Sequence, residues 1–425
     1  MTHHTLNRRA LIATTLGSVA AWAAPQAWAQ TTRTNAGDDA RLVVVFLRGA
    51  YDGLSALVPH GDANYYRLRP TIAIAAPDGS AQTTLALDST FGLHPALAPL
   101  QPLWQQGVLA AIPCAGSPDA TRSHFEAQHH WEIGIPGKNS ASPGWLNTLA
   151  GQRNVEALGV GEANPLILAG SAQVQLVPKG QAATKQGALG DARTRDAVMK
   201  LYAGDDALSK TFRAGAESRM ETAKALSDDE MQAQDMASGA MANRKEMAAA
   251  DNGAGSAKGL LLDAQHLNTL MRQNRALRLG FLSAGGWDTH ANQGNASGAL
   301  ANNLGSLAAT LVQLRREFSR PNDVVVVVSE FGRTSAENGT RGTDHGHGNA
   351  LWLMGNRVQG GRWHGRWDGL AQGSLHEGRD LPVHHDFRAV LAQVLRSTQG
   401  LNAQGLDALF PGFAWDAKLD GLMHA

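Results

Sequence analysis

Five consecutive valines, Val324–Val328, constrain the fold of this 425-residue chain more than any other stretch. Valine is β-branched and apolar, so the run predicts a strand buried on both faces, as central strands of parallel sheets are. A polar loop follows at once and contains Glu330 and Arg333. In open α/β sheets, ligands bind just beyond the carboxyl ends of the strands. We therefore expect Glu330 and Arg333 to lie at a functional site, Glu330 as a candidate metal residue and Arg333 as a group that can pair with a substrate anion.

The same loop ends in three side chains that can bind a metal. Asp344, His345 and His347 fall within four residues, and the glycines between them allow the backbone to bend around an ion. The apolar run Ala350–Met354 follows. The alternative is a polar hairpin loop whose histidines are only solvated.

A second metal-capable pair follows another predicted strand, Leu279–Leu282. Asp288 and His290 are two residues apart, so in an extended segment they project the same way and could bind one ion. The alternative is a loop aspartate and a histidine bound to its own neighbours. A helix with apolar residues from Leu300 to Phe318 then leads into the valine run, which predicts a right-handed strand–helix–strand unit. The two groups would thus emerge on one side of the sheet.

The first core strand is predicted at Leu42–Leu47, and Asp52 follows it between two glycines. Asp52 could bind a metal at the strand exit, or it could cap a following helix, as a turn aspartate often does.

A third strand, Val108–Pro113, leads to a helix that begins near Ser123. The S-x-x-E spacing of Ser123 and Glu126 predicts a capping box, which accounts for this serine structurally. In the functional alternative, Thr121 or Ser123 is a nucleophile at a helix N-terminus, where backbone N–H groups stabilise an anion.

Residues 190–259 differ in composition from the rest of the chain. Alanine, methionine and charged residues dominate, and no aromatic residue follows Phe212 in this region. We expect an α-helical insertion with a helix at Arg193–Leu226. The polar segment Ser227–Gly259 is expected to be mobile and dispensable for the core fold. Two further short strands are predicted at Thr71–Ala75 and Leu166–Leu168.

The N-terminus has the pattern of an export signal. Arg8 and Arg9 precede an apolar segment, Ala10–Ala24, and a small-x-small cleavage pattern ends at Ala29. We expect residues 1–29 to be a twin-arginine signal peptide, 30–40 a linker and 41–425 the folded domain. The alternative is an uncleaved anchor, although the segment is too short for a stable membrane span. The expected location is the periplasm or the exterior, reached through the twin-arginine translocase after folding in the cytoplasm.

Charge and cysteine content limit the partners and the covalent cross-links that this chain can have. Lys plus Arg and Asp plus Glu both number 37, so no basic excess favours a nucleic-acid partner. Cys114 is the single cysteine of the chain, which excludes an intramolecular disulfide. It ends an apolar run, and we interpret it as a buried structural thiol.

As a set, five segments resemble the signature segments of the bacterial domain of unknown function 1501 family. The match runs in order from about residue 42 to 413, and the segments read RGAYDGLSALVP, TRSHFEAQ, GWDTH, SEFGRT and DHGHGNALWLMG. That family is similar to the alkaline phosphatase and sulfatase superfamily. The resemblance implies an α/β fold with a mostly parallel central sheet flanked by helices, and a metal-assisted hydrolytic site.

The resemblance also implies roles for individual residues. Asp52 would match the early metal aspartate of the superfamily, and Thr121 or Ser123 its nucleophile. Asp288 and His290 would match a metal pair, although the superfamily usually spaces them further apart.

In the last motif, His345 or His347 would match the late metal histidine. Ser329-Glu330 stands where the superfamily commonly has Asp-His, which puts a second metal in doubt.

The sequence therefore predicts an exported metal-dependent hydrolase of phosphate or sulfate esters. Mixed carboxylate and imidazole ligands fit one or two zinc or manganese ions better than calcium. The substrate would be a small anionic, phosphorylated or sulfated ester. The alternative is a non-catalytic periplasmic scaffold that binds a metal or, through Trp363 and Trp367, a carbohydrate. A third hypothesis is a secreted structural partner without an ion.

Overall fold

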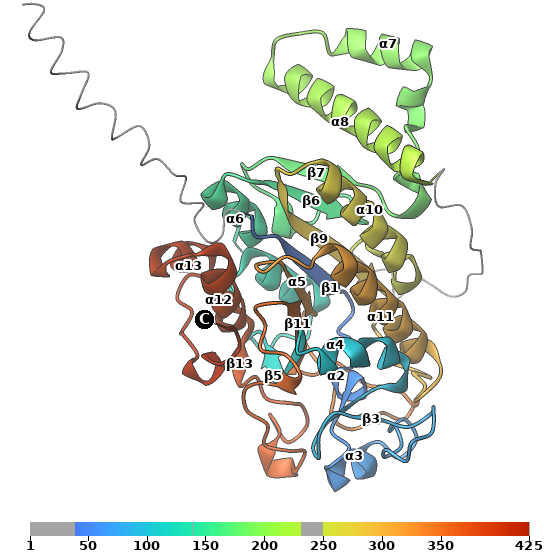
Figure 1. The fold of residues 1–425 in the computed structure, drawn as a ribbon, viewed down its shortest axis with the longest axis vertical. Helices are drawn as coiled ribbons and strands as arrows, with labels where there is room; N and C mark the ends of the chain where they lie inside the picture. The colour runs from blue at the N-terminus through green and yellow to red at the C-terminus, as the bar shows by residue number, and fades with distance from the viewer. Residues whose placement is uncertain (1–38, 139, 231–249, 425) are drawn as a thin grey trace, which may run out of the picture. The chain divides into compact units, whose positions relative to one another are not determined.

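The computed structural model describes residues 39–138, 140–230 and 250–424 (Figure 1). The chain divides into residues 1–38 and a compact unit, Asp39–Ala425, and only the second is described below. The expected signal peptide and nearly all of the expected linker lie outside the described residues. Within the described part, no helix combines the length and the apolar character needed to cross a membrane.

A mixed, mostly parallel sheet forms the centre of the compact unit. Its order is β12-β5-β11-β10-β1-β9-β6-β7, with β13 added to β5 and β8 added to β9. Among the described pairings, only those of β11 with β10 and with β5 are antiparallel. The strands are β1 (Leu42–Leu47), β5 (Leu109–Gly116), β6 (Glu156–Val160), β7 (Val174–Val177), β8 (Gly255–Ser256), β9 (Leu277–Gly285), β10 (Val324–Val328), β11 (Asn349–Gly355), β12 (Arg362–Trp363) and β13 (His385–Asp386).

A small antiparallel sheet has the order β2-β4-β3 and consists of β2 (Leu57–Val58), β3 (Leu85–Ala86) and β4 (Gly92–Leu93). The α-helices are α2 (Gly53–Ala56), α3 (Ala63–Leu68), α4 (Gln101–Gln105), α5 (His124–Ile133), α6 (Trp145–Arg153), α7 (Ala192–Leu201), α8 (Ala207–Glu230), α10 (Leu260–Gln273), α11 (Ala299–Glu317), α12 (Phe387–Gln399) and α13 (Ala403–Leu409). The 3₁₀ turns are η1 (Pro95–Leu100), η2 (Leu166–Leu168), η3 (Gly180–Ala182), η4 (Gly187–Gly190), η5 (Ala257–Gly259), η6 (Gln372–Ser374) and η7 (Ala417–Leu419).

Helices cover both faces of the central sheet. Val43 and Val45 of β1 pack into a cluster with residues of α4, α10 and α11. Val44 and Phe46 point the other way, into a cluster with residues of α5, α6, α12 and α13. A strand covered on both faces needs apolar residues at every position, which explains the continuous runs in β1 and β10.

The predicted fold class is confirmed. The strands expected at Leu42–Leu47 and Val324–Val328 are β1 and β10, and the long apolar stripe forms α11. Because β11 runs against its neighbours, its amino end lies at the edge where the other strands have their carboxyl ends. The loop 329–348 therefore starts and ends at this edge.

Two short strands were predicted wrongly. Residues 71–75 form only an isolated bridge at Ala75, because the carboxylate of Glu337 binds the N–H groups of Thr71 and Ile72 in place of a neighbouring strand. Residues 166–168 form η2, in which the carbonyls of Pro165 and Leu166 accept turn hydrogen bonds.

The insertion begins with two helices, α7 and α8, where one helix at Arg193–Leu226 was predicted. Asp206 separates them, because its carboxylate accepts the N–H of Ser209 and starts α8. Residues 231–249 lie outside the described part, so the expectation of mobility there stays a prediction. The end of the insertion returns to the sheet, where Gly255–Ser256 pairs with Ala284–Gly285 of β9.

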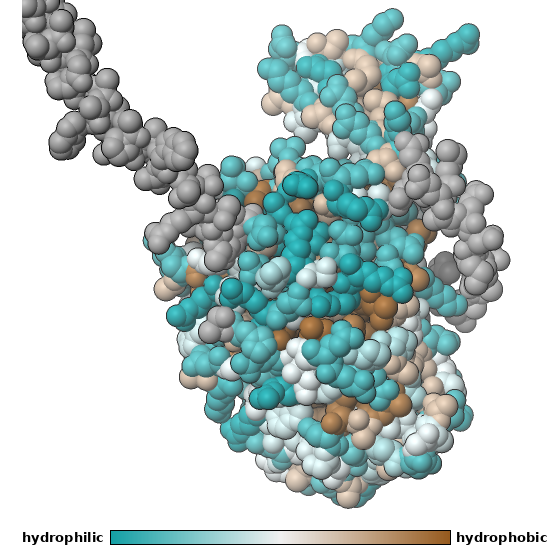
Figure 2. Space-filling view, viewed as in Figure 1, coloured by the Kyte–Doolittle hydropathy of each residue, from teal (hydrophilic) through white to brown (hydrophobic). Residues whose placement is uncertain are grey.

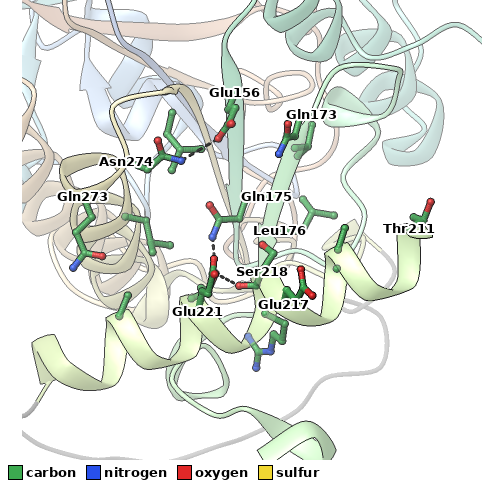
Figure 3. A pocket seen from close by; sticks show the side chains of 18 residues that line it. Glu156, Gln173, Gln175, Leu176, Thr211, Glu217, Ser218, Glu221, Gln273 and Asn274 are labelled. Atoms are coloured by element: carbon green, nitrogen blue, oxygen red, sulfur yellow. Dashed lines mark hydrogen bonds between the residues drawn. The ribbon is translucent and has the colours of Figure 1, made fainter. Parts of the chain in front are cut away.

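A polar groove of about 960 Å³ lies between α8, β7 and α10 (Figure 3). Gln175 of β7 bonds Thr222 of α8 across it, at 2.5 Å. Its lining residues belong to the amino-terminal parts of β6, β7 and β9 and to the two helices. Much of the face in Figure 2 is hydrophilic, with apolar residues showing in smaller patches.

We expect Leu304→Ala in α11 to lower the free energy of unfolding by about 2–5 kcal/mol, because it leaves a cavity against the sheet. Leu304 is fully buried, whereas Leu208 of α8 is 70% exposed. Leu208→Ala is the matched control and should change stability by less than about 0.5 kcal/mol. Urea unfolding measures both, and equal effects would contradict this packing.

Candidate metal centre

Loops from three strands and the start of one helix meet at the carboxyl edge of the sheet. Asp288 follows β9, Glu330 follows β10, and His345 lies in the loop before β11. His124 is the first residue of α5, which follows β5. The parallel strand directions bring these segments to one edge, as expected from the sequence.

Three of these side chains form a candidate metal site. The ligand atoms of His124, Asp288 and His345 all lie within 4.8 Å of one another. Nε2 of His124 is 2.9 Å from Nε2 of His345. The Asp288 carboxylate lies 3.3 Å from Nε2 of His345 and 3.6 Å from Nε2 of His124.

The hydrogen bonds of the outer ring nitrogens indicate which nitrogens are free to bind a metal. Nδ1 of His124 lies 2.8 Å from a carboxylate oxygen of Glu330, and Nδ1 of His345 lies 2.9 Å from the carbonyl of Arg122. Both partners only accept, so each Nδ1 carries hydrogen. In the neutral rings the two Nε2 atoms are then both acceptors, and their close contact requires a shared cation or an extra proton.

The separations fit a small ion. Ligand nitrogens at about 2.0–2.1 Å from a tetrahedral zinc lie roughly 3.3 Å apart. The observed separations of 2.9, 3.3 and 3.6 Å bracket that value, with Oδ1 of Asp288 facing His345 and Oδ2 facing His124. Two imidazoles and a carboxylate suit zinc or another transition metal.

His290 adds a third imidazole at the rim. Its Nε2 lies 3.0 Å from Nε2 of His345 and 3.0 Å from the Asp288 carboxylate. Its Nδ1 lies 3.1 Å from the carboxylate of Asp344, which orients the ring. Asp344 thus stands behind His290, and the expected roles of both as ligands stay predictions.

The charges around the site favour a cation. Burial alone would raise the pKa of Asp288, but hydrogen bonds from the histidines and the charge of Arg333 hold this pKa well below its usual range. Burial alone would lower the pKa of His124, but the carboxylates of Asp288 and Glu330 raise it to about 9. The site therefore stabilises positive charge where the ligand atoms meet.

Glu330 lies behind His124 and has no exposed surface. One of its carboxylate oxygens accepts hydrogen bonds from the N–H of Gly49 at 2.8 Å, Gln128 at 2.9 Å and His124 at 2.8 Å. Burial acts to raise the pKa of Glu330, but these bonds and the nearby His124 hold it below its usual value. The geometry makes Glu330 the residue that orients His124.

Arg333 is buried and bonded to the loops around the site. It donates to the carbonyls of Ala50, Thr343 and Gly49 and to the carboxylate of Asp288, the last at 2.5 Å. These donors point at protein groups, so the expectation that Arg333 binds a substrate anion stays a prediction.

Asp52 lies apart from the cluster. Its carboxylate accepts from both terminal nitrogens of Arg69, at 2.6 and 3.1 Å, and from Ser55 and Gln293. It occupies the N-cap position of α2 without a side-chain cap bond. Burial would raise the pKa of Asp52, and the adjacent Arg69 outweighs this and lowers it.

His347 also points away from the cluster, toward His376, with ring centroids 4.6 Å apart. Burial, with the charge of His376, lowers the pKa of His347 to about 4. The structure places His345, but not His347, with Asp288.

The two candidate hydroxyl nucleophiles make local bonds. Ser123 caps α5 by accepting the N–H of Glu126 at 3.5 Å. In a capping box the Glu126 carboxylate would also accept the backbone N–H of Ser123. Here it accepts the hydroxyl of Thr121 instead, at 2.7 Å. Both hydroxyls are thus engaged at the helix start.

His124 was missed by the analysis of the sequence, although it stands directly after Ser123. The signal was a histidine at the first position of a capped helix that follows a core strand. Asp288 and Glu330 were identified by the same kind of signal, a polar residue that follows a core strand.

Cys114 is buried in β5, and burial raises the pKa of its thiol. This agrees with a structural thiol.

A family description, "Protein of unknown function (DUF1501)", matches residues 39–410. The chain belongs to this family. A comparison with curated proteins finds no match.

Two solved structures match most of this chain at low TM-scores. The C-terminal periplasmic domain of EcEptC from Escherichia coli matches with a TM-score of 0.39 and 10% identity, covering 90% of this chain and 89% of that chain. Alkaline phosphatase from the Antarctic bacterium TAB5 matches with a TM-score of 0.33 and 12% identity, covering 77% of this chain and 94% of that chain. TM-scores of this size carry no inference about the site, which stands on its own geometry.

We expect Asp52→Asn to lower the free energy of unfolding by about 3–5 kcal/mol, because it leaves the buried Arg69 without its charge partner. Bound metal should stay as in the wild type, since Arg69 already holds the Asp52 carboxylate. Asp323→Asn, which breaks the buried pair of Asp323 with Arg41, is the matched control. Unfolding in urea and elemental analysis of the folded variants provide the test. Loss of metal from the Asp52 variant alone would make Asp52 a ligand.

Proposed function

We propose that this chain is an exported metal-dependent hydrolase of phosphate or sulfate esters. The observation that carries the proposal is the convergence of Nε2 of His124, Nε2 of His345 and the Asp288 carboxylate, with both Nδ1–H groups held from outside. His290 is the fourth candidate ligand. A bound divalent ion, zinc or manganese, would supply a Lewis acid that polarises an ester oxygen.

Two partly exposed arginines border the centre, and both are paired with carboxylates: Arg122 with Glu377 and Asp380, and Arg379 with Asp380. The side chain of Arg122 is 32% exposed and that of Arg379 is 44% exposed. Both belong to segments that hold His345, since the carbonyl of Arg122 bonds its ring and Arg379 bonds its carbonyl at 2.5 Å. Arginine binds phosphate and sulfate oxygens in bidentate geometry, and a substrate anion would have to replace these carboxylates to be bound here.

The second candidate function is a non-catalytic metal-binding scaffold. The local hydrogen bonds favour it, because Thr121 donates its hydroxyl to Glu126 and Ser123 acts as a helix cap. A carbohydrate-binding scaffold has less support. Trp363 and Trp367 pack edge-on against Phe91, with centroids 5.4 and 4.9 Å apart, and so contribute to the apolar packing.

We expect Asp288→Ala and His290→Ala to lower metal content and to reduce hydrolysis of aryl phosphate and sulfate esters at least about 100-fold, since each removes a candidate ligand. Ser123→Ala should keep the metal. If it also keeps hydrolysis, Ser123 is only a helix cap. His60→Ala is the histidine control, because His60 bonds the backbone carbonyls of Asp88 and Phe91. A metal-loaded wild type that turns over no ester would favour the scaffold.

We expect twin-arginine export to require Arg8 and Arg9. The double variant Arg8→Lys with Arg9→Lys should leave precursor in the cytoplasm, because the translocase reads the arginine pair. Fractionation followed by mass determination of the mature N-terminus, expected after Ala29, is the measurement. An unchanged periplasmic yield would rule out this route.

A further inference from the structure

The C-terminal end of the helical insertion reaches the candidate metal centre. Ala250 is 3% exposed, and its carbonyl accepts a hydrogen bond from Nε2 of Gln128 at 2.7 Å. Gln128 is a buried residue of α5, one turn after His124. The insertion and the helix that carries a candidate ligand are thus joined by a buried hydrogen bond.

Gln128 continues this connection to the ligand itself. Its amide oxygen accepts from Arg48 at 2.9 Å, and arginine only donates, so the orientation of the amide is fixed. The amide nitrogen therefore faces both the Ala250 carbonyl and the Glu330 carboxylate, the latter at 2.9 Å. The same oxygen of Glu330 accepts Nδ1–H of His124.

A second contact connects the same segment to the loop of Asp288. A carboxylate oxygen of Asp251 accepts the N–H of Gly286 at 2.8 Å. Gly286 has φ of +91°, and a Cβ on Gly285 would collide with the Asp251 carboxyl. The absence of side chains at Gly285 and Gly286 therefore leaves room for the Asp251 carboxylate beside the loop that leads to Asp288. Pairing of β8 with the end of β9 extends the contact by two residues.

We propose that residues 250–256 are a positioning element of the candidate metal centre, so that the His124 ring and the Asp288 loop are held in ligating geometry only while this segment is docked. Gln128 and Asp251 are the positioning residues. The inference rests on the proposed function, since it concerns the same metal centre. It revises the expectation that all of residues 227–259 are dispensable.

The electrostatics of Asp251 agree with this placement. Burial and the negative charges of Glu330 and Asp288 raise the pKa of Asp251 to about 6, while the N–H of Gly286 acts against them. The Asp251 carboxyl is thus close enough to interact electrostatically with Glu330 and Asp288.

Thermodynamic linkage gives the proposal a sharp consequence. If docking of the segment strengthens metal binding, metal binding must strengthen docking by the same factor. Zinc should therefore slow hydrogen exchange at the Gly286 amide and in β8.

The test compares three aspartate variants of the full mature chain. Asp251→Ala removes the acceptor of Gly286 N–H and should weaken zinc affinity about 10–100-fold, as loss of an outer partner of a ligand does. Asp251→Asn keeps an acceptor oxygen and should restore most of the affinity. Asp191→Ala is the matched control, because it removes a cap bond to Thr194 in α7 of the same insertion and should leave zinc affinity unchanged. Competition with a chromophoric chelator measures the affinities.

A measurement without metal separates failure of this inference from failure of the proposed function. Exchange at Gly286 and the ¹⁵N shifts of the His124 ring are recorded on metal-free wild type, Asp251→Ala and Gln128→Met. Faster exchange with Asp251→Ala and altered His124 shifts with Gln128→Met are the expected results.

Unchanged exchange and shifts in both variants would overturn the positioning role, whatever the wild type binds. If instead the wild type binds no zinc and turns over no ester, the proposed function fails. In that case the exchange and shift data still decide whether the segment positions the two loops.

Discussion

One buried carboxylate oxygen of Glu330 joins two separate parts of the chain, the loop after β1 and helix α5, at the edge of the sheet. It accepts N–H groups from the loop after β1, from Gln128 and from His124. Glu330 has no exposed surface, and a buried carboxylate is tolerated only when its oxygens are hydrogen-bonded. The three donors are therefore fixed in position by the buried carboxylate. The hydrogen bond from Nδ1 of His124 to this oxygen sets the orientation of the His124 ring.

Two buried arginines hold the segments around Glu330 in place. Arg48 binds Glu132 and Glu162 and fixes the amide of Gln128. Arg333 draws the loops after β1 and β9 together by donating to their carbonyls and to Asp288. Removing one partner of a buried ion pair strongly destabilises the folded protein, because the other charge is left buried and unpaired. The intact pair itself adds little net stability. These arginines thus specify the relative positions of loops that have no regular structure of their own.

The sequence predicted β1 and β10 correctly, because burial on both faces of a strand produces a continuous apolar run, whereas the short runs at 71–75 and 166–168 did not form strands. It did not distinguish Asp52 from Asp288, since both are aspartates in glycine-rich strand exits. Their difference comes from Arg69, Ser55 and Gln293, which surround Asp52 and come from separate segments. Ser55 lies close to Asp52 in the sequence, but Arg69 and Gln293 cannot be inferred from local spacing. Asp251 was missed for the same reason, because its carboxylate bonds the backbone of the distant Gly286.

The choice between His345 and His347 shows how backbone geometry decides what spacing leaves open. Both histidines follow the same pattern of alternating glycines. His345 forms an isolated bridge with Arg333, and Gly346 lies so close to the Arg333 backbone that a Cβ there would collide with it. At His347 the carbonyl still accepts the N–H of Gly332, and the N–H of Gly348 then bonds the carbonyl of Leu381. His347 consequently belongs to the surface shared with the 376–381 loop, where it meets His376. The motif is therefore held between the 332–333 segment and Leu381, with one imidazole at the candidate centre and the other beside His376.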